Sequence, residues 1–216
     1  MKYILIVAVL IALRLFVYPL VRRLVATMML RAGTRGALED VGAKALANVP
    51  DRILLVHQKL NTWNPGPEVV RLCDPLFSNG FQEGGLYSIR EMPGMMVRFM
   101  IKPAECVVAA VYLSARGTWL ELFTHYQNGD SATFSNRAAP GLDPRPSHPV
   151  VHAPGASSAD LYHKLVNERP KGVFRPLMTE DIGPAFERAY AEAATWRKNK
   201  GVTAAEVVQV AQRRAG

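Results

Sequence analysis

Cysteine is scarce in this sequence, and several motifs that reveal a function are missing. Two cysteines among 216 residues exclude a disulfide-dense scaffold and a four-thiolate metal or cluster site built within one chain. The sequence has no phosphate-binding G-x-x-x-x-G-K-[ST] or G-x-G-x-x-G, and no H-E-x-x-H, G-x-S-x-G or C-x-x-C. These absences predict no cofactor, and neither reaction nor substrate can be assigned from a motif.

A basic domain is also missing, although the net charge is +8. Residues 1–50 carry seven basic and two acidic side chains, whereas residues 51–216 carry 19 basic and 16 acidic ones and are nearly balanced. Zinc-finger spacing, an RNP-like aromatic motif and Lys/Arg-rich runs are all lacking. Nucleic acid is therefore not a predicted partner, and the positive charge is assigned to a bilayer surface.

Long apolar runs are confined to the N-terminus. Eleven apolar residues extend from Tyr3 to Leu13, and after Arg14 the pattern resumes as far as Val21. A helix of this length spans roughly 28 Å, close to the thickness of the bilayer hydrocarbon. We predict a transmembrane anchor within residues 1–32; the alternatives are a cleaved signal peptide, which lacks a convincing cleavage site here, and a buried helix.

Basic residues in and after this run suggest how the anchor is used. Arg14 either reaches a lipid head group or pairs with a group on a partner helix, which would make the protein a subunit of a membrane complex. The arginines predicted to contact membrane or partner are Arg14, Arg22, Arg23, Arg31 and Arg35. Four of them follow the run, which favours a cytoplasmic domain; the opposite topology stays open, because an uncleaved export signal also begins this way.

The remainder of the chain has the composition of a folded domain. The segment 33–36 (GTRG) is predicted to end the anchor, a short helix should cover 37–47, and the soluble domain should occupy 51–216 after a linker over 33–50. The run 52–57 fits a strand or a buried helical turn. The proline-rich stretch 138–155 is expected to be an extended, largely strandless crossing.

Short β-branched and aromatic runs separated by turn residues predict a five-stranded antiparallel meander. The expected strands are residues 86–92, 95–102, 106–114, 118–126 and 131–136. One face of the sheet should be core and the other a mixture of charged, aromatic and methionine side chains. Helices are expected over 159–168, 179–198 and from 203 onward, and a capping box of Thr203 and Glu206 should open the last of them. These helices should cover the core face, which gives a two-layer α+β domain.

Candidate site residues are few. His125, with Glu121 on the same strand face and Asp130 near the following turn, is the best acid–base group, although a structural hydrogen-bonded pair is the commoner arrangement. Met95, Met96, Met100 and Trp119 could form an adaptable partner surface or fill the core. His148 and His152 would lie about 13 Å apart in an extended chain, so no metal site is predicted.

Two functional hypotheses follow. The first is a non-enzymatic, single-pass membrane protein whose α+β domain is a binding or assembly module, an accessory subunit of a membrane complex. The second is a membrane-tethered hydrolase, or a small-ligand or lipid-binding domain, with a cleft between the mixed sheet face and the proline-rich crossing. A pocket that joins His125, Glu121 and Asp130 would favour the second hypothesis.

Overall fold

The computed structural model describes the backbone of residues 18–60 and 65–215 and the side chains of residues 33–60 and 65–213. The chain is divided into two compact units. The first comprises residues 1–46 and 201–216, and the second comprises residues 47–200. Most of the predicted anchor lies outside the described residues, and Arg14 with it. Among the helices that are described, none combines the length and apolar content needed to cross a bilayer.

The first unit contains helices α2 (Tyr18–Ala47) and α6 (Ala204–Ala215). The prediction that Gly33–Gly36 interrupts the helix is wrong, because α2 continues through both glycines. A helical glycine costs only about 1 kcal/mol relative to alanine, and the ion pairs Arg35–Glu39 (2.9 Å) and Asp40–Lys44 (3.4 Å) lie at favourable helical spacing.

The start of α6 confirms a sequence prediction. The predicted capping box is formed, since Thr203 Oγ1 accepts from Glu206 N at 3.2 Å and Glu206 Oε2 accepts from Thr203 N at 2.9 Å. Gly42 of α2 lies close to this helix: a Cβ built there would lie 3.0 Å from Val202 Cβ and 3.2 Å from Val207 Cγ2. A larger residue here would require these valine side chains to move by a few tenths of an ångström.

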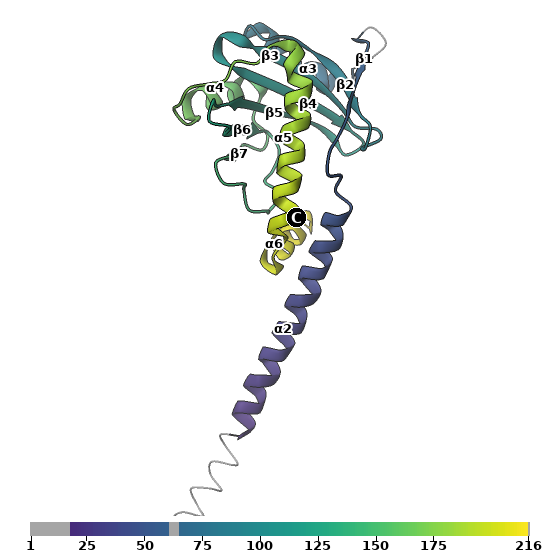
Figure 1. Ribbon diagram of the computed structural model, residues 1–216, viewed down its shortest axis with the longest axis vertical. Coiled ribbons are helices and arrows are strands. Elements are labelled where there is room, and N and C mark those ends of the chain that lie inside the picture. The colour runs from purple at the N-terminus through teal and green to yellow at the C-terminus, as the bar shows by residue number, and fades with distance from the viewer. Residues whose placement is uncertain (1–17, 61–64, 216) are drawn as a thin grey trace, which may run out of the picture. The chain divides into compact units, whose positions relative to one another are not determined.

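The second unit is an α+β domain built on a seven-stranded mixed sheet (Figure 1). Neighbours pair in chain order and antiparallel from β1 to β6, and β7 joins β6 in parallel. The strands are β1 (Leu55–Gln58), β2 (Gln82–Ile89), β3 (Met96–Lys102), β4 (Val107–Ser114), β5 (Gly117–His125), β6 (Ser131–Ser135) and β7 (Val150–His152). The five predicted strands are present as β2 to β6, with β1 and β7 added at the edges.

Helices cover both faces of this sheet. On one face, α3 (Pro67–Ser78) and α4 (Ser158–Glu168) bury Leu76 and Leu161 against a cluster that includes Leu122. On the other, α5 (Thr179–Lys200) crosses the sheet and buries Ile182 beside Phe99 (Figure 1). The two-layer prediction is therefore wrong, and so is the prediction of a single core face.

The central strand explains this difference. All residues from Val107 to Tyr112 are buried, as expected of a strand that is covered on both sides. Alternate residues of this run enter opposite clusters: Ala109 packs on the side of α3 and α4, and Ala110 on the side of α5. Burial of alternate residues on opposite sides is expected of a strand that lies between two layers of helices.

The methionine cluster also differs from prediction. Met100 is fully buried, with 0% of its surface exposed, so assigning it to a partner surface is wrong. Met95 and Trp119 are half-buried and pack against the core on the side of α5, and Met96 is half-buried at the start of β3. A continuous partner surface formed by these four residues is therefore not present.

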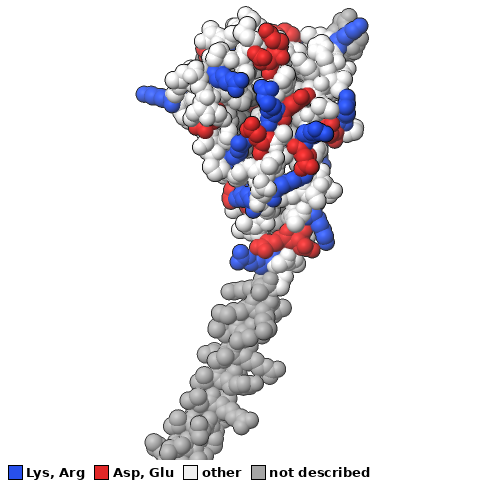
Figure 2. All heavy atoms as spheres, in the orientation of Figure 1, with Lys and Arg blue, Asp and Glu red and all other residues white. Residues whose placement is uncertain are grey.

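Charge on the visible face of the described domain is mixed, with basic and acidic side chains interspersed (Figure 2). The ion pairs of the domain include Lys198–Asp51 and Lys200–Asp143, each with a nitrogen–oxygen distance of 2.6 Å. Partly exposed pairs of this kind contribute little to stability individually.

Candidate functional site

A cleft of about 470 Å³ lies on the face of the sheet that α5 crosses. Three parts of the second unit line it: the strands supply Glu121, His125 and Ser131, the proline-rich segment 138–155 supplies Arg145 and His148, and α5 supplies the far wall. Its volume falls within the range of about 300–1,000 Å³ that is usual for small-molecule sites. We take this cleft as the candidate site.

Glu121 contributes a carboxyl group to the cleft from β5. Its Oε2 accepts a hydrogen bond of 3.2 Å from the hydroxyl of Tyr112, which is stacked on Trp119 with ring centroids 4.7 Å apart. Burial raises the pKa of Glu121, although the Tyr112 hydrogen bond and the nearby His152 and Arg137 oppose the shift. The environment therefore favours the protonated carboxyl more than water does.

His125 lies four residues further along the same strand and faces the same cleft. Its ring makes an edge contact with Phe123 at 5.5 Å, and the described residues offer no hydrogen-bond partner to its imidazole nitrogens. Burial lowers the pKa of His125, and the charge of Arg175 lowers it further. At neutral pH the ring is therefore uncharged and able to accept a proton or a hydrogen bond.

Ser131 and His148 form the shortest side-chain contact among the groups of the cleft. Ser131 begins β6 directly opposite His125 in the β5–β6 register, and its Oγ lies 2.8 Å from His148 Nδ1. Burial and the charge of Arg145 lower the pKa of His148, while Asp130 and Glu192 act in the opposite direction. The cleft therefore holds two imidazoles whose pKa values are lowered, one of them in hydrogen-bond contact with the Ser131 hydroxyl.

Cations gather at the same cleft. Arg145 lies 3.4 Å from Glu192, a long ion pair, whereas Arg175 and Arg188 have no ion-pair or side-chain hydrogen-bond partner among the described residues. Glu121 and Glu192 supply the only acidic side chains in the described lining, and burial favours the neutral form of Glu121. The cleft is therefore electrostatically suited to a ligand with a negative group.

The predicted trio is brought together only in part. Glu121 and His125 line the cleft, but Asp130 lines a neighbouring hollow of about 390 Å³ and accepts from Asn128 Nδ2 at 2.8 Å within its own turn. Ser131 lines both hollows. Asp130 affects the cleft through its charge, because it raises the pKa of His148.

The residues predicted from the sequence do not include Ser131, and they include His148 only as a candidate metal ligand. The predicted turn over 127–130 would place Ser131 opposite Tyr126, whereas in the structure the connection is one residue longer and Ser131 pairs with His125. No comparable sequence signal exists for His148, because a non-repetitive crossing has no periodicity that fixes where it meets the sheet.

The residues predicted to contact the membrane can be placed only in part. Arg14 lies outside the described residues, and the side chains of Arg22, Arg23 and Arg31 lie outside the described side chains. Arg35 is exposed on α2 and pairs with Glu39. Their proposed contacts with lipid or a partner stay predictions.

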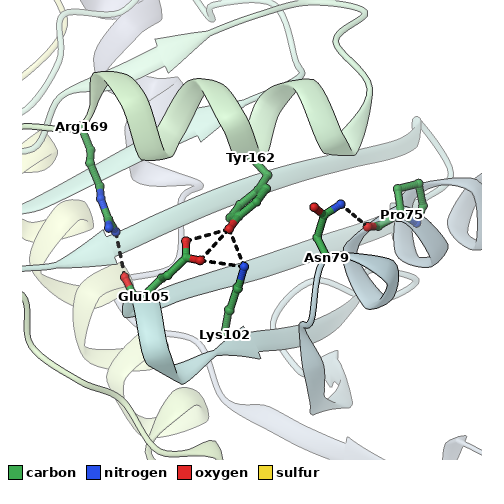
Figure 3. Close-up of polar contacts among 6 residues, drawn as sticks. All are labelled: Pro75, Asn79, Lys102, Glu105, Tyr162 and Arg169. Carbon is green, nitrogen blue, oxygen red and sulfur yellow. Dashed lines mark hydrogen bonds and ion pairs between the residues drawn. The ribbon is translucent and has the colours of Figure 1, made fainter.

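A second polar cluster lies on the opposite side of the sheet (Figure 3). Lys102 Nζ lies 2.7 Å from Glu105 Oε1 and donates to Tyr162 Oη at 2.5 Å, while Tyr162 Oη donates to Glu105 Oε2 at 2.7 Å. Arg169 donates to the carbonyl of Glu105 at 2.9 Å. Each polar group is paired, so this cluster ties α4 to the β3–β4 connection and is not a second candidate site.

Metal and thiol chemistry receive no support from the described residues. Within them, no group of three or more His, Cys, Asp or Glu side chains is arranged to hold a metal ion. Burial raises the pKa of Cys73 to about 11, so its thiol is protonated at neutral pH and is a weak nucleophile.

Glu121→Gln should stabilise the protein at neutral pH. Glutamine can still accept the Tyr112 hydrogen bond. The pKa of Glu121 is higher in the folded protein than in the unfolded chain, where it is about 4.3. The stability of the wild type therefore falls as the pH rises from the unfolded pKa through the folded pKa. The variant lacks this loss, so its advantage in thermal midpoint should grow from pH 4 to pH 7. A difference in thermal midpoint that does not change with pH would contradict the raised pKa of Glu121. The control is Glu180→Gln, which changes an exposed glutamate at the start of α5.

Comparison with known proteins gives no relative: no family model, no curated protein and no solved structure matches this chain.

Proposed function

We propose that this chain is a single-pass membrane-anchored protein whose α+β domain binds a small ligand in the cleft between α5, the proline-rich segment and the sheet. The observation that carries the proposal is the convergence of Glu121, His125 and His148 in one concave site with two arginines that have no ion-pair partner among the described residues. Titratable groups with shifted pKa values in a cleft are typical of functional sites. The anchor is proposed from the apolar run 3–21.

The lining indicates what kind of ligand would fit. Arg175 and Arg188 are exposed and have no ion-pair partner in the part of the chain that the structure describes, so a negative group on the ligand would gain charge-assisted hydrogen bonds there. Leu177 and Phe186 supply apolar surface in the same cleft. We therefore propose a small organic acid, a carboxylate on an apolar body, as the ligand class.

Binding of carboxylates of increasing chain length tests this proposal. Acetate, butyrate and octanoate are titrated into the full chain in lipid nanodiscs and followed by calorimetry. We expect octanoate to bind most tightly and Arg175→Gln to weaken it by about tenfold, the loss of one charge-assisted hydrogen bond. The control Arg116→Gln changes an exposed arginine of the β4–β5 turn, outside the cleft. The proposal would be overturned if octanoate did not bind the wild type, or if Arg175→Gln and Arg116→Gln bound it equally well.

The accessory-subunit hypothesis is a second proposal, supported by Arg14 in the predicted span. Co-purification in mild detergent tests it: a partner membrane protein retained by the wild type and lost from Arg14→Leu is expected. A monodisperse monomer with no partner would contradict it. A reporter fused after Gly216 would separately test the proposed cytoplasmic placement of the domain.

A further inference from the structure

The contact between Ser131 and His148 has the geometry of a nucleophile and its base. The distance from Ser131 Oγ to His148 Nδ1 is 2.8 Å, within the range of about 2.6–3.2 Å for such pairs. Ser131 is half-buried and lines both hollows, so the pair lies at the wall of the cleft. A serine hydroxyl becomes a useful nucleophile only when a neighbouring base removes its proton.

The backbone holds His148 in position on both sides. Its own N–H donates to the carbonyl of Arg145 at 3.1 Å, and the carbonyl of Pro149 accepts from Thr133 N of β6 at 3.0 Å. Ser147, directly before it, has a φ of 62°, one of two positive values among the described non-glycine residues. Backbone strain of this kind often occurs at functional sites, and here it lies next to the proposed base.

We propose that Ser131 is the nucleophile and His148 the general base of a hydrolase site for small carboxylic esters with an apolar acyl group. This inference rests on the proposed function, because it uses the same cleft and the same apolar lining. His148 would act through Nδ1, which requires the tautomer with its proton on Nε2.

The reaction balances without a cofactor. Ser131 Oγ attacks the carbonyl carbon and forms a C–O bond while its proton passes to His148 Nδ1. The ester C–O bond then breaks, and the leaving alkoxide takes that proton and departs as an alcohol. Water next attacks the acyl-serine and gives one proton to Nδ1; this proton returns to Ser131 Oγ as the carboxylic acid leaves.

Other groups of the cleft suit this chemistry. Burial and Arg145 lower the pKa of His148, so at neutral pH most of the imidazole is in the base form. The oxyanion formed during each attack carries negative charge, and Arg175, an exposed residue of the same lining, adds positive charge to the cleft. Leu177 and Phe186 offer surface for an apolar acyl chain.

Covalent labelling tests the inference directly. The full chain in lipid nanodiscs is treated with a fluorophosphonate, which reacts with activated serines, and the labelled peptide is identified by mass spectrometry. We expect one label on Ser131, none in Ser131→Ala, and labelling slowed at least tenfold in His148→Gln. The rate in the wild type should rise with pH through a midpoint below 6.5, as neutral His148 forms. Hydrolysis of p-nitrophenyl butyrate should follow the same order.

Matched variants separate chemistry from structure. Ser114→Ala changes a serine on β4, and His163→Gln changes an exposed histidine on α4; neither lines the cleft, and both should be labelled like the wild type. Thermal melting shows whether Ser131→Ala and His148→Gln fold. If octanoate binds but Ser131 is not labelled, the contact between Ser131 and His148 has only a structural role. This result would overturn the hydrolase inference and leave the binding proposal in place. A label on Ser131 without carboxylate binding would overturn only the binding proposal's ligand class.

Discussion

Replacing Phe99 by alanine is expected to lower the free energy of unfolding by about 3–5 kcal/mol, the range for deleting a buried phenylalanine side chain. Phe99 is fully buried on β3, with 0% exposure. Its ring lies 5.7 Å from that of Tyr87 on β2 and 5.1 Å from that of Phe186 on α5. The cavity would therefore open between the sheet and the helix that forms the wall of the cleft. Urea unfolding followed by tryptophan fluorescence measures the loss.

A phenylalanine on the other side of the sheet is the control for this prediction. Phe77 on α3 is 37% exposed, and the described structure places Arg98 over its ring at 5.3 Å. Because much less surface returns to water, Phe77→Ala should cost about 1 kcal/mol. Equal losses in both variants would show that α5 does not pack on the sheet as described. Octanoate affinity should fall only in Phe99→Ala, because the wall of the cleft is affected.

Glu105→Gln is expected to destabilise the protein by about 1–2 kcal/mol at pH 7. A hydrogen bond to a charged group contributes about 1.5–3 kcal/mol, and partial exposure of the pair reduces this value. Burial alone would raise the pKa of Glu105, but hydrogen bonds from Lys102 and Tyr162 outweigh it and lower the pKa. The carboxylate therefore stabilises the fold above its unfolded pKa, and this stability is lost as the pH falls through the native pKa.

Denaturation curves between pH 7 and pH 3 measure this effect. The difference between wild type and Glu105→Gln should shrink as the pH falls, because both side chains are then neutral. Tyr162→Phe removes the shared hydroxyl and should show part of the loss at pH 7. Glu168→Gln is the control, since its ion pair with Lys164 is more exposed and should contribute less than about 0.5 kcal/mol. A loss in Glu105→Gln that does not change with pH would contradict the electrostatic role of this cluster.

Local patterns predicted most of the sheet. The turn after Tyr126 places positive φ at Gly129, and the runs on both sides pair as expected of a hairpin. The capping box at Thr203 was likewise predictable, because its hydrogen bonds join residues three apart in the chain. The predicted break at Gly33 and Gly36 is wrong, because glycine lowers the stability of a helix but does not prevent it from forming.

The candidate site was predictable only where one strand or one turn defined it. Alternation along β5 places Glu121 and His125 on the same face, and this relationship depends on the chain alone. Asp130 was included because it is close in sequence, yet its side chain bonds within its own turn and lines the neighbouring hollow. His148 reaches Ser131 across 17 residues, through a segment without periodicity, and no local rule predicts that contact.

The sequence by itself determined where five of the seven strands lie, that most of the basic excess belongs to the N-terminal 50 residues, and that disulfide-dense scaffolds are excluded. These properties depend on neighbours a few residues apart, which the sequence displays directly. Only the tertiary structure decided that both faces of the sheet are covered and that Glu121, His125, Ser131 and His148 share one cleft. The physical reason is that packing between helices and a sheet depends on surfaces distant in the chain, and a run such as 107–112 is compatible with burial on one side or on two.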